Sequence, residues 1–106
     1  GIMHKDLLII CETGISASLL VSKMLETIRA KNLSYEIDYA TIRNVEEKLN
    51  YKDYDVLLLT PQVARSEEKV KEIIKKEKCT AQIVYIKQED FRYMNIENII
   101  ASIEED

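Results

Sequence analysis

The 106 residues suit a single domain (residues 1–106) with one modest core, since 46% of them are hydrophobic and 32% are charged. The net charge of −4, with acidic and basic residues interspersed, argues against a nucleic-acid-binding surface. No apolar run reaches the roughly 18 residues of a membrane-spanning helix, and Leu7–Ile10 is too short for a signal peptide, so a cytoplasmic location is expected.

The first half of the chain alternates strand and helix signals. Residues 5–11 form a short apolar run that ends in Cys11, which is typical of a fully buried strand. Apolar side chains then recur at helical spacing and predict an amphipathic helix over roughly 16–31. Residues 34–40 alternate polar and apolar side chains, as strands near a sheet edge do. Residues 43–50 are expected to form a short helix with Asn44 as its N-cap.

The second half repeats the alternation. Residues 55–60 read Asp-Val-Leu-Leu-Leu-Thr, which predicts another buried strand, closed by Pro61. A helix is expected to begin at Ser66, because Glu67 and Glu68 suit its first turn. A fourth strand over 81–86 and a last helix over about 95–103 complete the pattern.

Four strands separated by helices predict an α/β fold, with a parallel sheet covered by helices on both faces in a Rossmann-like arrangement. The strands over 5–11 and 55–60 should be central, because strands buried on both faces lack alternation. Right-handed crossovers then give the spatial order 2-1-3-4. The carboxyl end of the first strand, occupied by Cys11, falls at the switch point where such sheets bind ligands.

The segment from Cys11 into the following helix has the chemistry of an anion-binding loop. It comprises Cys11, Glu12, Thr13, Gly14, Ile15, Ser16, Ala17 and Ser18. A loop that enters a helix presents unpaired N–H groups and the positive end of the helix dipole. Gly14 is expected to let the backbone curl, and Ser16 and Ser18 to cap the helix or donate to a phosphate oxygen. The same field is expected to lower the pKa of the Cys11 thiol and so produce a nucleophile. The alternative is that Cys11 is simply a small apolar residue that ends a strand.

Two runs resemble one known family over nearly the whole chain. The run L-I-I-C-E-T-G-I-S-A-S-L-L-V-S-K-M over 8–24 resembles the active-site segment of the B component (IIB) of lactose/cellobiose-type sugar phosphotransferase systems. The run over 55–64, with its Pro-Gln-Val-Ala end, resembles the third strand and following loop of the same family.

The resemblance implies a phosphohistidine–sugar phosphotransferase component whose phosphocysteine is Cys11 and whose phosphate-binding loop is Glu12–Ser18. The loop of Pro61, Gln62 and Val63 would lie beside it. Cys11 would take a phosphoryl group from a phosphohistidine on the A component and pass it to a sugar bound by the membrane-embedded C component. The resemblance implies no metal and no organic cofactor. A carrier visited by two partners in turn is expected to be a monomer, and the sugar cannot be read from this chain.

Two positions depart from the family pattern. Glu12 puts a carboxylate where small or polar residues are commoner, and its side chain is expected to point outward because it would repel a dianion. Ala17 stands where the family usually has Ser or Thr, which leaves one hydroxyl donor fewer.

Two other functions fit parts of the pattern. A low-molecular-weight tyrosine phosphatase or arsenate reductase shares the fold plan, but such enzymes have a Cys-x5-Arg loop, and position 17 here is Ala. Their general acid lies after the fourth strand beside a proline, whereas Asp90 in that stretch has no such neighbour. A regulatory domain, whose Cys11 phosphorylation is sensed by a partner, would use the same chemistry. Galactitol- and ascorbate-type B components also carry a loop cysteine, but the Pro-Gln-Val-Ala run favours the lactose/cellobiose type.

Three further features are given structural interpretations. His4 is expected to be a surface residue rather than a zinc ligand, since zinc needs several nitrogen or sulfur donors. Cys79 has no Cys-x-x-Cys spacing and is expected to be structural. Gly1 and Ile2, which precede Met3, look like a cloning remnant and are excluded from the fold.

Overall fold

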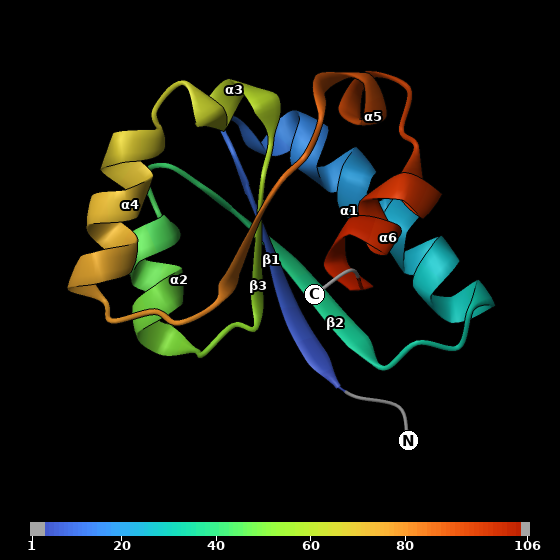
Figure 1. Ribbon diagram of the computed structural model, residues 1–106, viewed down its shortest axis with the longest axis horizontal. Helices are drawn as coiled ribbons and strands as arrows, with labels where there is room; N and C mark the ends of the chain where they lie inside the picture. Colours follow the sequence, from blue (N-terminus) through green and yellow to red (C-terminus); the bar gives the residue numbers. More distant parts are fainter. Residues whose placement is uncertain (1–3, 105–106) are drawn as a thin grey trace.

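A parallel sheet of four strands runs through the computed structural model, which describes residues 4–104 (Figure 1). The strands are β1 (Lys5–Cys11), β2 (Tyr35–Thr41), β3 (Val56–Leu59) and β4 (Gln82–Tyr85). They lie in the order β2-β1-β3-β4, and all neighbouring pairs are parallel. This confirms the predicted order, with the two continuous apolar runs at the centre and the alternating strand at an edge. Gly1 and Ile2 lie outside the described residues.

Helices cover both faces of the sheet, as predicted. They are α1 (Gly14–Ala30), α2 (Val45–Tyr51), α3 (Pro61–Ala64), α4 (Glu67–Lys76), α5 (Gln88–Arg92) and α6 (Ile96–Glu104). Figure 1 shows α1 and α6 on one side of the sheet and α2 and α4 on the other. The short helices α3 and α5 lie at the top of that view, toward the end where β1 finishes.

The core has two layers that the sheet separates. Along β1, Leu7 and Ile9 pack with apolar residues of α1 and α6, whereas Leu8 and Ile10 pack with those of α2 and α4. All four side chains are fully buried. Successive residues of a strand point to opposite faces, so an uninterrupted apolar run is what a strand between two helical layers requires. No helix among residues 4–104 has the length and apolar character that crossing a lipid bilayer requires.

Two short helices and one helix boundary differ from the expectations. Residues 61–64, expected as a loop, form α3, with Pro61 in the first helical position where its missing N–H is tolerated. Residues 88–92 form α5, for which no element was expected. Helices this short contain too few turns for hydrophobic periodicity to reveal them. Helix α1 begins at Gly14 rather than near Ser16, so only Glu12 and Thr13 separate it from β1.

Candidate functional site

Cys11 ends β1 between the two strands that flank it, and its side chain is almost completely buried. Only 2% of Cys11 is exposed. Its thiol donates a hydrogen bond to the Ala40 carbonyl oxygen on the neighbouring strand β2, with an Sγ–O distance of 3.3 Å. Because β2 and β3 lie on opposite sides of β1, Cys11 stands at the switch point of the sheet, as predicted.

Burial raises the pKa of the Cys11 thiol above its ordinary value. The expectation that the loop lowers this pKa is therefore wrong in direction, because removal of the sulfur from water disfavours the thiolate. The hydrogen bond to Ala40 also needs the proton on sulfur. At neutral pH the resting form is the thiol, so any reaction at sulfur must also remove a proton.

The raised pKa gives a pH dependence that alkylation can measure. In a Cys79→Ser background, the rate of Cys11 alkylation by iodoacetamide should still be rising at pH values above the ordinary thiol pKa, because only the thiolate reacts. Intact mass followed over time at neutral and alkaline pH gives this profile. The control is the same variant unfolded in urea, in which the pH midpoint of the alkylation rate should lie lower because the thiol is exposed to water. A folded midpoint at or below the unfolded one would contradict the assignment.

A small cavity opens beside the sulfur. It has a volume of about 100 Å³ and is lined by Cys11, Glu12, Thr13, Ser16, Thr60, Gln62 and Phe91. A water molecule takes about 30 Å³ in the liquid, so the space suits roughly three oxygen-sized groups. The polar lining brings hydroxyl and amide donors from two separate segments, the start of α1 and the start of α3, to one place.

Other residues of the predicted site lie outside the lining. Ala17 and Val63 are fully buried, and Ile15 points into solvent with 86% of it exposed. Ser18 is exposed, and its hydroxyl donates to the Gly14 carbonyl oxygen at 2.9 Å, one turn back in α1. Pro61 is the first residue of α3. Glu12 is exposed, in line with an outward side chain, although it also belongs to the rim of the cavity.

The structure adds Thr60 and Phe91 to the candidate site. Thr60 is buried, and its hydroxyl donates to the Ile10 carbonyl oxygen at 3.3 Å, directly beside Cys11. It is the polar last residue of a buried apolar run, a signal that was available in the sequence. Phe91 comes from α5, which gives no comparable signal.

Gly14 does not use the conformational freedom expected of it. It is the first residue of α1, and no described glycine has a positive φ. An added Cβ would meet Tyr39 Cε2 at 3.6 Å, an ordinary contact. Thr13 occupies the N-cap position in extended conformation, without a side-chain capping bond. The backbone enters the helix without strain, so the expected curl at Gly14 is wrong.

Gly14→Ala should therefore raise the free energy of unfolding by about 0.5 kcal/mol, because alanine restricts the unfolded chain and fits the helical backbone. Urea unfolding followed by circular dichroism measures this change. A loss larger than 1 kcal/mol would indicate that residue 14 needs a conformation that only glycine adopts.

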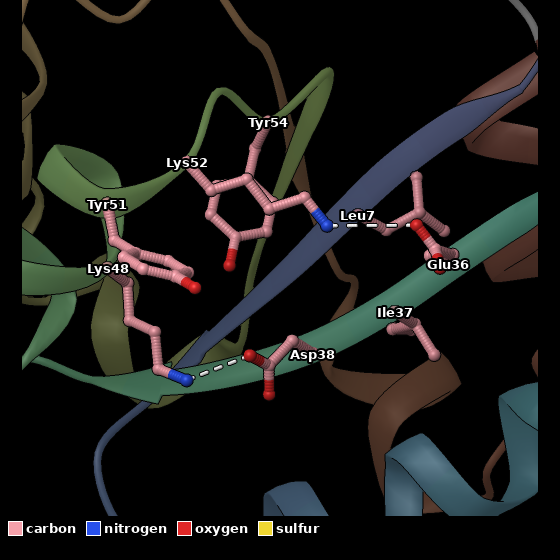
Figure 2. Close-up of a pocket in the computed structure, with 8 residues that line it drawn as sticks. All are labelled: Leu7, Glu36, Ile37, Asp38, Lys48, Tyr51, Lys52 and Tyr54. Atoms are coloured by element: carbon pink, nitrogen blue, oxygen red, sulfur yellow. Dashed lines mark hydrogen bonds and ion pairs between the residues drawn. The ribbon is translucent and has the colours of Figure 1, made fainter.

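A larger hollow lies near the opposite end of the sheet (Figure 2). Its volume is about 300 Å³, and its lining includes Leu7, near the start of β1, roughly 13 Å of strand away from Cys11. The charged groups there are paired: Lys48 contacts Asp38 at 2.8 Å, and Lys52 lies 3.7 Å from Glu36. Figure 2 shows Lys48, from α2, and Lys52, directly after α2, reaching toward β2. The described residues that line this hollow include no cysteine.

His4, which is half-exposed, does have two carboxylates as neighbours. His4, Asp6 and Glu36 place their ligand atoms within 4.8 Å of one another. The Lys52 ammonium already lies 3.0 Å from Asp6 and neutralises this group. The cluster also stands at the end of the sheet away from Cys11, so it adds nothing to the chemistry of the cavity.

The features of a phosphatase do not assemble around Cys11. Among the described residues, those that line the cavity include no arginine. Asp90 lies in the stretch where the phosphatases carry their general acid. It is buried and accepts hydrogen bonds from the side-chain amides of Asn95 and Asn98. Cys79 is half-buried and precedes β4, at the opposite end of the parallel sheet from Cys11. The site therefore contains one nucleophile and polar donors, without a cationic clamp.

Residues 6–102 match the family model described as the lactose/cellobiose-specific IIB subunit of the PTS system. No curated protein matches the sequence significantly.

Two solved structures have the same fold. The cellobiose-specific phosphotransferase IIB component protein from Borrelia burgdorferi is 26% identical, covers 96% of this chain and 90% of its own, and superposes with a TM-score of 0.73. The lactose-specific IIB component domain of the phosphoenolpyruvate:carbohydrate phosphotransferase system from Streptococcus pneumoniae superposes with a TM-score of 0.73. It covers 94% of this chain and 98% of its own, and at 13% identity it supports the fold alone.

Proposed function

Because the chain belongs to the lactose/cellobiose-specific IIB family of the sugar phosphotransferase system, we propose that Cys11 is its phosphoryl-carrying residue. The carrier takes phosphate from a phosphohistidine on the A component and passes it to a sugar bound by the membrane C component. The observation that carries the assignment is the buried Cys11 sulfur, which faces a small cavity with polar walls at the switch point of the sheet.

The first transfer is a displacement at phosphorus. The Cys11 sulfur forms the S–P bond while the N–P bond of the phosphohistidine breaks and its electron pair stays on the imidazole nitrogen. That nitrogen takes up the thiol proton, which the raised pKa keeps on the sulfur of the resting protein. The leaving group thus serves as the base for the thiol proton.

The second transfer regenerates the thiol. A sugar hydroxyl oxygen forms the O–P bond, the S–P bond breaks, and the hydroxyl proton replaces the phosphoryl group on sulfur. The raised pKa again favours this protonated product. No other residue is required to store a proton between the two steps.

The phosphoryl oxygens have candidate donors on both sides of the cavity. Thr13 and Ser16 line it from the start of α1, and Gln62 lines it from α3. The free N–H groups in the first turn of α1 add the positive end of the helix dipole. Glu12 at the rim repels a dianion, so its carboxylate should stay toward solvent in the phosphorylated carrier.

We also propose a single domain over residues 1–106, because one sheet organises both layers of the core that the described residues 4–104 form. The carrier acts as a monomer, because both partners must reach the same sulfur. It works in the cytoplasm, where the phosphoryl donor chain meets the inner side of the C component.

Intact mass measures the proposed transfer directly. The protein is incubated with phosphoenolpyruvate and the general phosphotransfer proteins, with and without a lactose-type A component. One phosphoryl group should be added only when the A component is present. If the A component is shown to be phosphorylated and the protein still gains no mass, the carrier function is refuted for this pairing.

A further inference from the structure

One wall of the Cys11 cavity is aromatic, and it comes from a distant part of the sequence. Phe91 lies in the short helix α5, which follows β4, and it lines the cavity together with residues from β1, α1 and α3. It is half-buried and packs against the core layer beneath α1 and α6. The remaining lining residues, apart from Cys11, all have hydroxyl, amide or carboxylate side chains. Phe91 differs from these residues because its side chain cannot form a conventional hydrogen bond with water.

Asp90 fixes the helix that carries Phe91. It is only 9% exposed, and its Oδ1 accepts hydrogen bonds from Asn95 Nδ2 at 3.2 Å and Asn98 Nδ2 at 3.1 Å. Its backbone carbonyl accepts a third, from the Asn95 N–H at 2.8 Å. Asn98 belongs to α6, so these bonds tie α5 to a longer helix that is anchored in the core. Asp90 itself does not line the cavity.

A phosphocysteine carrier needs protection from water. Hydrolysis wastes the phosphoryl group whenever water reaches the phosphorus before an acceptor does, and closed sites prevent such reactions by excluding water. We propose that Phe91 excludes water from the phosphoryl group on Cys11, and that Asp90 is the positioning residue that holds Phe91 in place. This role rests on the proposed phosphoryl transfer and adds the means by which the intermediate survives until an acceptor arrives.

The lifetime of the phosphorylated protein tests the proposal. Phosphorylated wild type, Phe91→Ala and Phe91→Leu are separated from the donor proteins, and loss of the phosphoryl group is followed by intact mass. Phe91→Ala should lose it roughly tenfold faster than wild type, while Phe91→Leu, which keeps an apolar side chain, should fall in between. Tyr93→Ala is the matched control, because Tyr93 is a neighbouring aromatic that is 63% exposed and outside the cavity lining. Equal lifetimes for wild type and Phe91→Ala would overturn the proposal.

Asp90 should act through Phe91 rather than on its own. Asp90→Ala is expected to shorten the lifetime of the adduct although Phe91 is still present, because α5 loses its bonds to Asn95 and Asn98. Asp90→Asn keeps an acceptor oxygen and should restore a lifetime near that of wild type. Thermal unfolding of each variant shows whether the fold is intact. An Asp90→Ala protein that is folded and has a wild-type lifetime would remove Asp90 from the account.

A second measurement needs no phosphorylation. In a Cys79→Ser background, Phe91→Ala should speed the alkylation of Cys11 by iodoacetamide roughly tenfold at fixed pH, because the same wall screens the thiol. An unchanged rate would overturn the proposal whatever the transfer assay shows. If the wild type accepts no phosphate from the A component but Phe91→Ala is alkylated faster, the screening of the thiol is supported and the carrier function is refuted for this pairing.

Discussion

Cys11→Ser is expected to reduce formation of the phosphoryl adduct by roughly 10³-fold or more, the scale seen when a nucleophile is removed. Serine has nearly the shape of cysteine and retains a hydrogen that can bond to the Ala40 carbonyl, so the fold should be preserved. Its hydroxyl is a far weaker nucleophile than sulfur, and the described residues that line the cavity include no histidine or lysine to activate it. Phosphorylation in the presence of the A component, followed by intact mass, measures the loss.

Cys79→Ser is the matched control for this experiment. Cys79 is half-buried, packs against the core layer beneath α2 and α4, and lies outside the Cys11 cavity. The variant should be phosphorylated at the wild-type rate. Phosphoryl transfer that survives in Cys11→Ser, or that fails in a folded Cys79→Ser protein, would show that Cys11 is not the nucleophile.

Leu57→Ala and Leu58→Ala should each lower the free energy of unfolding by about 3 kcal/mol, because both leave a cavity in a close-packed core. The two residues are adjacent on β3 and fully buried. Leu58 packs into the layer beneath α1 and α6, and Leu57 into the layer beneath α2 and α4. Large losses at both positions require helices on both faces of the sheet. For a domain of this size, each loss is a substantial fraction of the total stability.

Leu19→Ala makes the same chemical change on the surface. Leu19 is 51% exposed on α1, so its replacement should change the free energy of unfolding by less than about 0.5 kcal/mol. Urea unfolding gives all three values from the shift in midpoint at constant slope. If only one of the two β3 variants is destabilised beyond Leu19→Ala, then one face of the sheet lacks the cover described here.

The sheet could be predicted from sequence because strand burial leaves a direct trace in the pattern. The continuous apolar runs over 5–11 and 55–60 became the central strands, and the alternating run over 34–40 became an edge. Strand order then followed from chain connectivity. The position of Cys11 at the switch point follows from the same two facts.

The details of the site could not be predicted in the same way. Phe91 reaches the cavity through a helix too short to show periodicity, and nothing in its neighbours relates it to Cys11. The helix dipole alone predicts a lowered pKa for Cys11. Burial raises this pKa instead, and burial depends on the packing of the whole sheet, which the sequence of the loop does not reveal. Glycine permits a left-handed backbone at residue 14, but the chain enters α1 without needing it.

The proposed carrier function requires that the phosphoryl group is bound to the sulfur of Cys11. Its most direct test is to phosphorylate the wild-type protein through the A component, cleave it under conditions that preserve the S–P bond, and locate the added mass by fragmentation. We expect the whole phosphoryl mass on Cys11, within the segment Lys5–Ser18, and none on Cys79. A phosphoryl group on Thr13, Ser16, Cys79 or any other residue would contradict it.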